Sequence, residues 1–168
     1  KDGRTAEQVE EDTRRALQRF LQNLPDGVER FVENGPVGHP RFAMLTKDLL
    51  RLQDSELWTG AQLRSLLERL EEHFLTQTGT PRKRLWNGYS AGTFPSKEDR
   101  KSHQEMVEAS AKDLPGISQD FRAGLNAAQA RGFRRLFSMT EKEYCQALER
   151  NATLDFPELQ ARALKLLS

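Results

Sequence analysis

Apolar residues recur along this chain with the three- and four-residue spacing of amphipathic helices. The strongest stripe runs from Leu63 to Leu75, where leucine and phenylalanine alternate with charged residues. Further stripes run from Val9 to Leu24 before it and from Met106 to Leu114 after it. Because this spacing places apolar side chains on one face of a helix, the pattern predicts about seven helices.

Capping residues and helix-breaking residues indicate where these helices begin and end. In a capping box, a threonine hydroxyl and the side chain three residues later satisfy free backbone N–H groups of the first turn. Capping boxes are expected to open helices at Thr5, Thr59 and Thr140, and single N-caps at Ser96, Ser118 and Asp155. Helix ends are expected at residues 25, 34–36, 78–81 and 115–116, which contain proline or glycine.

The sequence shows no sustained two-residue alternation rich in Val, Ile and Thr, which is typical of strands. The expected class is all-α: an irregular helical bundle or a short array of helix pairs with one long central loop. A chain of 168 residues fits a single domain, in which helical halves 1–77 and 96–168 are joined by loop 78–95. Because the chain begins at Lys1 and directly with helix-forming sequence, we expect it to be excised from a longer protein.

Composition limits the classes of partner. Charged residues make up 30% of the chain, hydrophobic residues 36%, and mean hydropathy is -0.75. The 26 basic and 25 acidic residues leave a formal charge of +1, so no global field attracts nucleic acid or an anionic membrane. No apolar run approaches the roughly 20 residues of a membrane span. We expect no membrane partner, and any electrostatic binding must come from a local patch.

Cysteine and histidine do not indicate a metal site. A single Cys145 excludes an internal disulfide and is compatible with a reducing compartment; it is expected to be a buried small apolar residue. His39, His73 and His103 lack the spacing of zinc ligands and are interpreted as surface histidines. The sequence therefore predicts no metal and no cofactor.

The stretch Gly88-Tyr89-Ser90-Ala91-Gly92 matches G-x-S-x-G, the pattern of a serine-hydrolase nucleophile. Such a nucleophile needs a buried strand before the serine and a helix directly after it. Residues 82–87 are too charged for a central strand, and residues 93–95 cannot open a helix directly after the turn. We therefore assign no catalytic residue and expect Gly88 and Gly92 to supply turns with positive φ.

The same segment is nevertheless the first candidate for a functional surface, because it combines basic and aromatic residues in an unusually long connection. The candidate residues are Arg82, Lys83, Arg84, Trp86, Tyr89 and Phe94. Such residues can anchor a protein interface, or can hold a phosphate backbone while rings stack on bases. In the alternative interpretation, Trp86 and Phe94 fold inward to pin the loop on the core and the basic residues are merely solvated.

A second basic group lies near an expected helix end. Arg131, Arg134 and Arg135 surround Phe133 and Phe137. If this helix lies beside the loop, the two groups form one positive surface. In the alternative interpretation, these arginines complement the helix macrodipole and bind free carbonyls at the helix C-terminus.

The leading functional hypothesis is a non-enzymatic adaptor or scaffold domain that binds a protein partner through the loop. The first alternative is binding of RNA or single-stranded nucleic acid by the two basic groups, with affinity that falls steeply with salt. The second alternative is a secreted bacterial effector domain that acts on host proteins.

Overall fold

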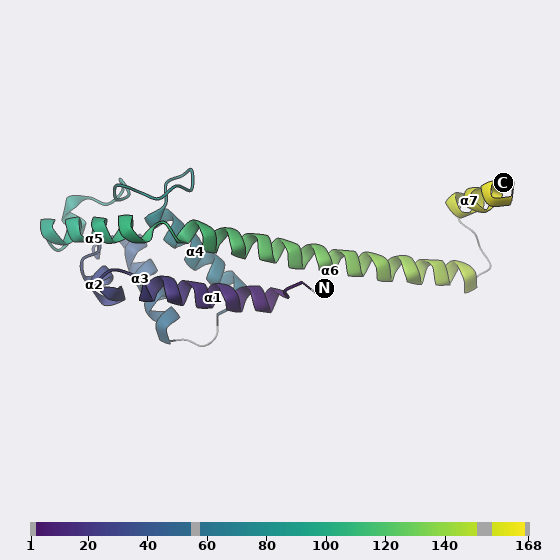
Figure 1. Cartoon of the computed structure of the whole chain (residues 1–168), viewed down its shortest axis with the longest axis horizontal. Coiled ribbons are helices and arrows are strands. Elements are labelled where there is room, and N and C mark those ends of the chain that lie inside the picture. The colour runs from purple at the N-terminus through teal and green to yellow at the C-terminus, as the bar shows by residue number, and fades with distance from the viewer. Residues whose placement is uncertain (1–2, 55–57, 151–155, 167–168) are drawn as a thin grey trace. The chain divides into compact units, whose positions relative to one another are not determined.

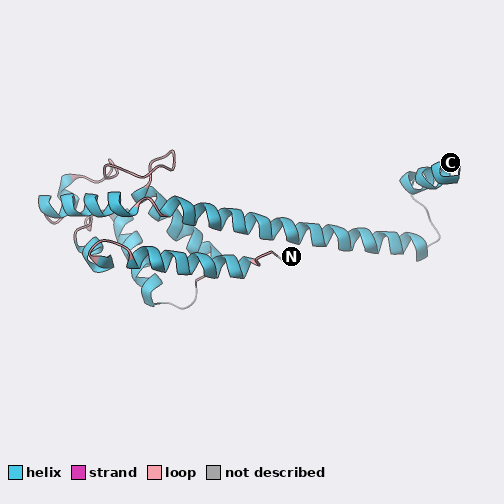
Figure 2. Ribbon diagram, viewed as in Figure 1, coloured by secondary structure: helices cyan, strands magenta, loops and turns pink. Residues whose placement is uncertain are grey.

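The computed structural model describes residues 3–54, 58–150 and 156–166, and these residues form seven α-helices and one short 3-10 helix (Figures 1 and 2). No strand is present in the described ranges, which confirms the all-α class. The elements are α1 (Ala6–Gln22), α2 (Gly27–Glu33), α3 (Pro40–Asp54), α4 (Gly60–Phe74), η1 (Ala91–Thr93), α5 (Lys97–Ser110), α6 (Leu114–Arg150) and α7 (Phe156–Leu166).

Contacts divide the chain into two compact units, Lys1–Asn126 and Ala127–Ser168. The first unit contains α1 to α5, the connection between α4 and α5, and the first part of α6. The second unit contains the remainder of α6 and α7. The long connection is thus part of the first unit.

The core of the first unit is built around α4. This helix packs against α1, α3 and α5, and α2 packs against α1 and α5. The predicted apolar stripe of α4 is buried, and its members are Leu63, Leu66, Leu67, Leu70 and Phe74. Each fully buried leucine or phenylalanine stabilises the fold by about 1.5–3 kcal/mol relative to an exposed position. The strongest periodic signal of the sequence therefore forms the centre of the bundle.

The expected starts of α1, α4 and α5 are confirmed. The Thr5 hydroxyl accepts a hydrogen bond from the Gln8 N–H at 3.2 Å, and the Gln8 side chain accepts one from the Thr5 N–H at 2.9 Å. Thr59 and Gln62 form the same reciprocal pair at the start of α4. Ser96 caps α5 by accepting from the Asp99 N–H at 2.9 Å. These caps were predictable because their partners lie only three residues apart.

The helix boundaries expected between residues 115 and 140 are wrong, because α6 is continuous from Leu114 to Arg150. Pro115 lies in its first turn, where the N–H that proline lacks has no intrahelical partner anyway. Thr140 does not cap a helix; its hydroxyl donates to the Leu136 carbonyl one turn earlier, at 2.9 Å. Ser118 is buried and its hydroxyl donates to Glu71. The expected cap Asp155 lies outside the described residues.

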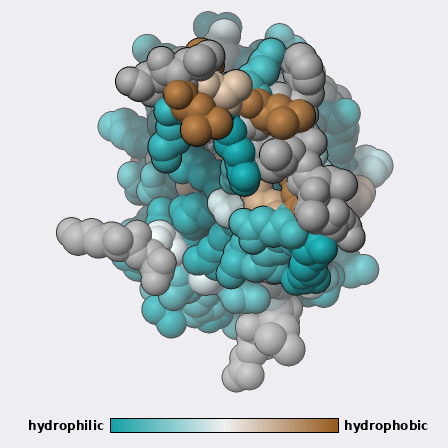
Figure 3. Space-filling model, turned by 90° about the vertical axis from the view of Figure 1, so that its right-hand side faces the viewer, coloured by the Kyte–Doolittle hydropathy of each residue, from teal (hydrophilic) through white to brown (hydrophobic). Residues whose placement is uncertain are grey.

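The helices that the structure describes include no candidate membrane span. None of them combines the length and the apolar character needed to cross a bilayer. On the face that Figure 3 shows, most of the coloured residues are hydrophilic and apolar residues gather in a few places. This agrees with the low mean hydropathy of the sequence.

Candidate functional site

The connection between α4 and α5 is attached to the end of α4 by its own backbone. Leu75 and Pro81 form an isolated antiparallel bridge, and the Arg82 N–H donates to the Phe74 carbonyl at 2.9 Å. The tight turn between them passes through Gly79, whose φ of +76° is a conformation that favours glycine. The turn therefore places Arg82 and the residues that follow it directly beside the C-terminus of α4.

The rings of this connection face the core. Tyr89 and Phe94 are buried, and Trp86 is half-buried with its ring 5.3 Å from that of Tyr89 in a T-shaped contact. Leu85, between the basic residues and Trp86, is also buried. The structure thus places two of the three candidate rings in the hydrophobic core, where they hold the connection against α4 and α5.

Two histidines form the polar centre of this core, so their interpretation as surface residues is wrong. His73 of α4 and His103 of α5 are buried, with 2% and 0% of their surfaces exposed. Their Nε2 atoms lie 2.9 Å apart, His73 Nδ1 lies 2.8 Å from the Tyr89 hydroxyl, and His103 Nδ1 lies 3.1 Å from the Phe31 carbonyl. One polar chain therefore links α2, α4, α5 and the connection.

The direction of this hydrogen-bonded chain follows from the Phe31 carbonyl, which can only accept. His103 must donate from Nδ1, so its Nε2 accepts from the Nε2–H of His73. His73 Nδ1 then accepts from the Tyr89 hydroxyl. All three side chains are neutral in this arrangement, and each ring nitrogen has a partner.

Burial keeps the pair neutral. Desolvation lowers the pKa of His103 to about 4, although the Phe31 carbonyl acts in the opposite direction. Desolvation also lowers the pKa of His73 well below 6.5, and the neighbouring His103 and Arg82 lower it further. Desolvation raises the pKa of Tyr89 to about 12, so that its hydroxyl remains a donor. The arrangement is that of a satisfied buried network.

The sequence contained a signal for these buried histidines. His73 lies three residues after Leu70 in the apolar stripe of α4, and His103 lies three and four residues before Met106 and Val107 in α5. Both therefore occupy the buried faces of their helices. A histidine that lies on the apolar stripe of a helix is expected to be buried. The spacing typical of metal ligands was the wrong criterion for deciding whether these histidines are exposed.

His39 lies at the edge of the same cluster. It is half-buried, and its ring is in T-shaped contact with Trp86 at 5.6 Å and with Tyr89 at 5.1 Å. The guanidinium of Arg41 lies 4.7 Å above the Trp86 ring. The ring of Trp86 is thus already engaged on its face and at its edge, and it is not a free platform for a stacked base.

The expectation that Gly88 and Gly92 adopt positive φ is wrong, because only Gly27 and Gly79 do so among the described glycines. Gly88 is required for a different reason. The six-membered ring of Trp86 lies where a Cβ of residue 88 would stand. Around Gly92 there is open space, so no contact explains this glycine.

A groove of about 690 Å³ lies beside the connection. Arg82, Lys83 and Arg84 line it together with Lys112, which lies between α5 and α6. Pro81 and Leu85 contribute apolar surface, and Glu108 is the only acidic residue of the lining. The described lining therefore carries four positive charges against one negative charge.

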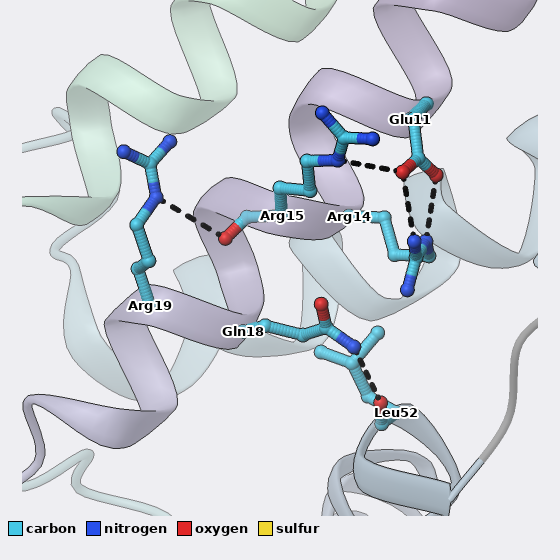
Figure 4. Close-up of polar contacts among 6 residues, drawn as sticks. All are labelled: Glu11, Arg14, Arg15, Gln18, Arg19 and Leu52. Atoms are coloured by element: carbon cyan, nitrogen blue, oxygen red, sulfur yellow. Dashed lines mark hydrogen bonds and ion pairs between the residues drawn. The ribbon is translucent and has the colours of Figure 1, made fainter.

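Several other basic residues of the first unit form ion pairs with carboxylates of the fold. On α1, both carboxylate oxygens of Glu11 accept from Arg14 at 2.8 Å, and one also accepts from Arg15 at 2.7 Å (Figure 4). These hydrogen bonds lower the pKa of Glu11 to about 2. Arg69 pairs with Asp48 and Arg122 with Glu71. Their charge is compensated within the fold.

The four bases of the groove have no such compensation. Within the part of the chain that the structure describes, none of Arg82, Lys83, Arg84 and Lys112 forms an ion pair. The Nε atom of Arg82 is buried and has no hydrogen-bond partner among these residues. The groove therefore concentrates uncompensated positive charge beside apolar surface.

Ser90 lies in a local geometry unlike that of a hydrolase nucleophile. It is exposed and precedes the three-residue η1 rather than an α-helix. Its carbonyl accepts from the Thr93 hydroxyl at 2.7 Å. The motif is therefore a surface turn that leads into the buried Phe94.

The second basic group belongs to the other compact unit. Arg131, Arg134 and Arg135 lie within α6, which continues to Arg150, so their expected position at a helix end is wrong. Phe133 and Phe137 are exposed on the same helix, as is Cys145, which was expected to be buried. α6 continues through this segment, and none of the described residues from 127 to 150 is buried.

Among the described residues, no group of three or more His, Cys, Asp or Glu side chains is arranged to hold a metal ion. Comparison with known proteins adds no assignment for the groove. No protein-family model matches this chain, and neither a curated protein nor a solved structure shows significant similarity to it. The function of the groove is therefore inferred from its physical chemistry.

Proposed function

We propose that this chain is a non-enzymatic interaction domain that binds an acidic segment of a partner protein in the groove lined by Arg82, Lys83, Arg84 and Lys112. The observation that carries the proposal is the uncompensated charge of these four side chains. Elsewhere in the first unit, arginines such as Arg69 and Arg122 are paired with carboxylates of the fold. A carboxylate supplied by a partner would complete the same pairing in the groove.

The apolar surface of Pro81 and Leu85 supports a partner that combines acidic with apolar side chains. Interfaces gain most of their affinity from apolar contacts at the centre and use charge to select and orient the partner. A groove of this volume accommodates a few side chains of an extended segment. The proposed partner is therefore a peptide-like acidic segment rather than a folded surface.

Nucleic acid is the less favoured partner for a structural reason. Binding of single strands uses aromatic rings as stacking platforms beside basic residues. Tyr89 and Phe94 are buried, and Trp86 is covered by Arg41 and packed against Tyr89. The groove offers charge without an available ring, which suits carboxylates better than unpaired bases.

The test is fluorescence anisotropy with two labelled probes: a peptide of alternating glutamate and leucine, and single-stranded RNA of similar length. Lys83→Glu/Arg84→Glu changes exposed residues of the groove and is expected to weaken peptide binding at least about 10-fold. Lys47→Glu/Arg64→Glu is the matched control, because it makes the same charge change at exposed positions of α3 and α4. The control is expected to bind as the wild type does.

Equal weakening by both variants would show that the whole protein's charge attracts the peptide, and the proposal would fail. RNA bound more tightly than the peptide, with affinity that falls steeply between 50 and 200 mM salt, would replace it with the nucleic-acid alternative.

A further inference from the structure

The part of α6 in the second unit carries exposed aromatic residues. Phe133 and Phe137 have 72% and 73% of their surfaces exposed, and Tyr144 has 50%. Large rings this exposed on a helix are costly in water and typically mark an interaction surface. These residues belong to the second compact unit, whereas the groove is lined by residues of the first.

The exposed rings belong to a regular seam. Residues 130, 133, 137, 140, 144 and 147 follow one another at spacings of three, four, three, four and three. This is the heptad spacing of a coiled coil, in which each residue of the seam inserts into a hole between four residues of the facing helix. All six positions are exposed, and they are Ala130, Phe133, Phe137, Thr140, Tyr144 and Ala147. Over these residues the seam is about 26 Å long.

We propose that this seam pairs with the same seam of a second copy of the chain, in antiparallel orientation. In a two-fold symmetric pair centred between residues 138 and 139, Phe133 faces Tyr144 of the other copy and Phe137 faces Thr140. The first contact joins two rings, and the second places a large side chain against a small one. The terminal positions, Ala130 and Ala147, face each other and permit close approach.

Charge beside the seam selects the antiparallel orientation. Arg134 and Glu141 occupy equivalent flanking positions, one heptad apart, and both are exposed. In the antiparallel pair, Arg134 of each copy lies beside Glu141 of the other, giving two opposite-charge pairs. In a parallel pair, Glu141 would lie beside the apolar Leu136 and Arg134 beside Gln129. The complementary arrangement therefore exists only in the antiparallel pair.

The test is sedimentation equilibrium of the full 168-residue chain from about 1 to 200 µM. A monomer–dimer equilibrium is expected, with a dissociation constant in the micromolar range because the seam is shorter than three heptads. Phe137→Asp is expected to raise this constant at least about 10-fold. Met139→Asp, which changes an exposed apolar residue outside the seam, is the matched control and is expected to change it less than about 3-fold.

A charge-swap series tests the orientation. Arg134→Glu and Glu141→Arg are each expected to weaken the dimer about 5-fold, because each creates two like-charge pairs, and the double variant is expected to restore it. Circular dichroism of each variant checks that helix content is unchanged.

Three results would overturn the proposal. The first is a monomer throughout the concentration range, which includes the case where α7 covers the seam within one chain. The second is equal weakening by Met139→Asp and Phe137→Asp. The third is failure of the double charge swap to restore the dimer, which would exclude the antiparallel register.

Discussion

A hydrogen bond joins His73 to His103 in the core of the first unit, where their Nε2 atoms lie 2.9 Å apart. Because the Phe31 carbonyl requires the Nδ1–H of His103, the pair holds a single tautomeric arrangement and both rings are neutral. Protonating His103 at Nε2 would place its new N–H against the Nε2–H of His73, and protonating His73 at Nδ1 would require the Tyr89 hydroxyl to become an acceptor. Because the fold buries both rings in the neutral form, the free energy of unfolding depends on pH.

Mild acid is therefore expected to destabilise the protein. The folded-state pKa values of both histidines are below the ordinary 6.5, and that of His103 is about 4. Above pH 6.5 neither state binds these protons, whereas below it the unfolded chain binds them and the folded chain does not. Each histidine thus lowers the free energy of unfolding by up to about 1.4 kcal/mol per pH unit below pH 6.5.

Urea unfolding followed by circular dichroism at pH 7.5, 6.5 and 5.5 measures this effect. Glu11 does not affect the comparison between these pH values. Its pKa is lowered from 4.5 to about 2, so its contribution to the free energy of unfolding is lost only below pH 4.5. Nitrogen-15 NMR provides the second measurement, since it reports the tautomer of each ring. Stability that stays constant down to pH 5.5, or a His103 that titrates near 6.5, would contradict the buried neutral pair.

Tyr89→Phe is expected to lower the free energy of unfolding by about 1–3 kcal/mol. The substitution keeps the ring contacts but removes the hydroxyl that donates to His73 Nδ1, leaving a buried acceptor without a partner. Chemical denaturation measures the change. Ser90→Ala is the control on the same connection, because Ser90 is exposed and its loss is expected to change stability by less than about 0.5 kcal/mol.

Two glycines of α6 are expected to respond to alanine with opposite signs. A Cβ at Gly124 would lie 2.8 and 2.9 Å from the methyl carbons of Val9 on α1, so Gly124→Ala is expected to destabilise the first unit by about 1–3 kcal/mol. A Cβ at Gly132 meets nothing within 4 Å, so Gly132→Ala is expected to stabilise the helix by about 0.5–1 kcal/mol. Thermal unfolding distinguishes them, and equal effects would show that α6 does not approach α1 as described.

The Trp86 ring is expected to move in Gly88→Ala and to stay in Gly92→Ala. The first substitution places a methyl group where the ring lies, whereas the second meets open space. Tryptophan emission, recorded with Trp58→Phe as background so that only Trp86 reports, is expected to shift to longer wavelength in Gly88→Ala alone. An unchanged spectrum in that variant would mean that the ring does not pack on Gly88.

The helical class and several helix starts could be predicted because their causes are local. The capping pairs of Thr5 with Gln8 and of Thr59 with Gln62 join residues three apart, and the stripe of α4 repeats within a single helix. The same local signals failed at Thr140, because a threonine hydroxyl can also donate to the carbonyl one turn earlier and leave the helix continuous. A capping sequence permits a helix start but does not require one.

The candidate surface was predictable only in its composition. The sequence identified Arg82, Lys83 and Arg84. It contained no signal that Lys112 lines the same groove, or that no carboxylate of the described residues forms an ion pair with these basic side chains. It left open whether the rings lie with the basic residues at the surface or fold onto the core, and the fold separates them: Tyr89 and Phe94 lie in the core and the basic side chains line the groove. Whether a side chain of the connection points toward the core or toward solvent depends on how the connection packs against the helices.

The sequence by itself determined where α1, α4 and α5 begin and that the face of α4 from Leu63 to Phe74 is apolar, because periodicity and capping act over three or four residues. Only the tertiary structure decided which faces meet. His73 and His103 are 30 residues apart, and His103 and Phe31 are 72 apart. Their contacts exist because α2, α4 and α5 pack together, and such packing depends on the shapes of whole helices rather than on the spacing within any one of them.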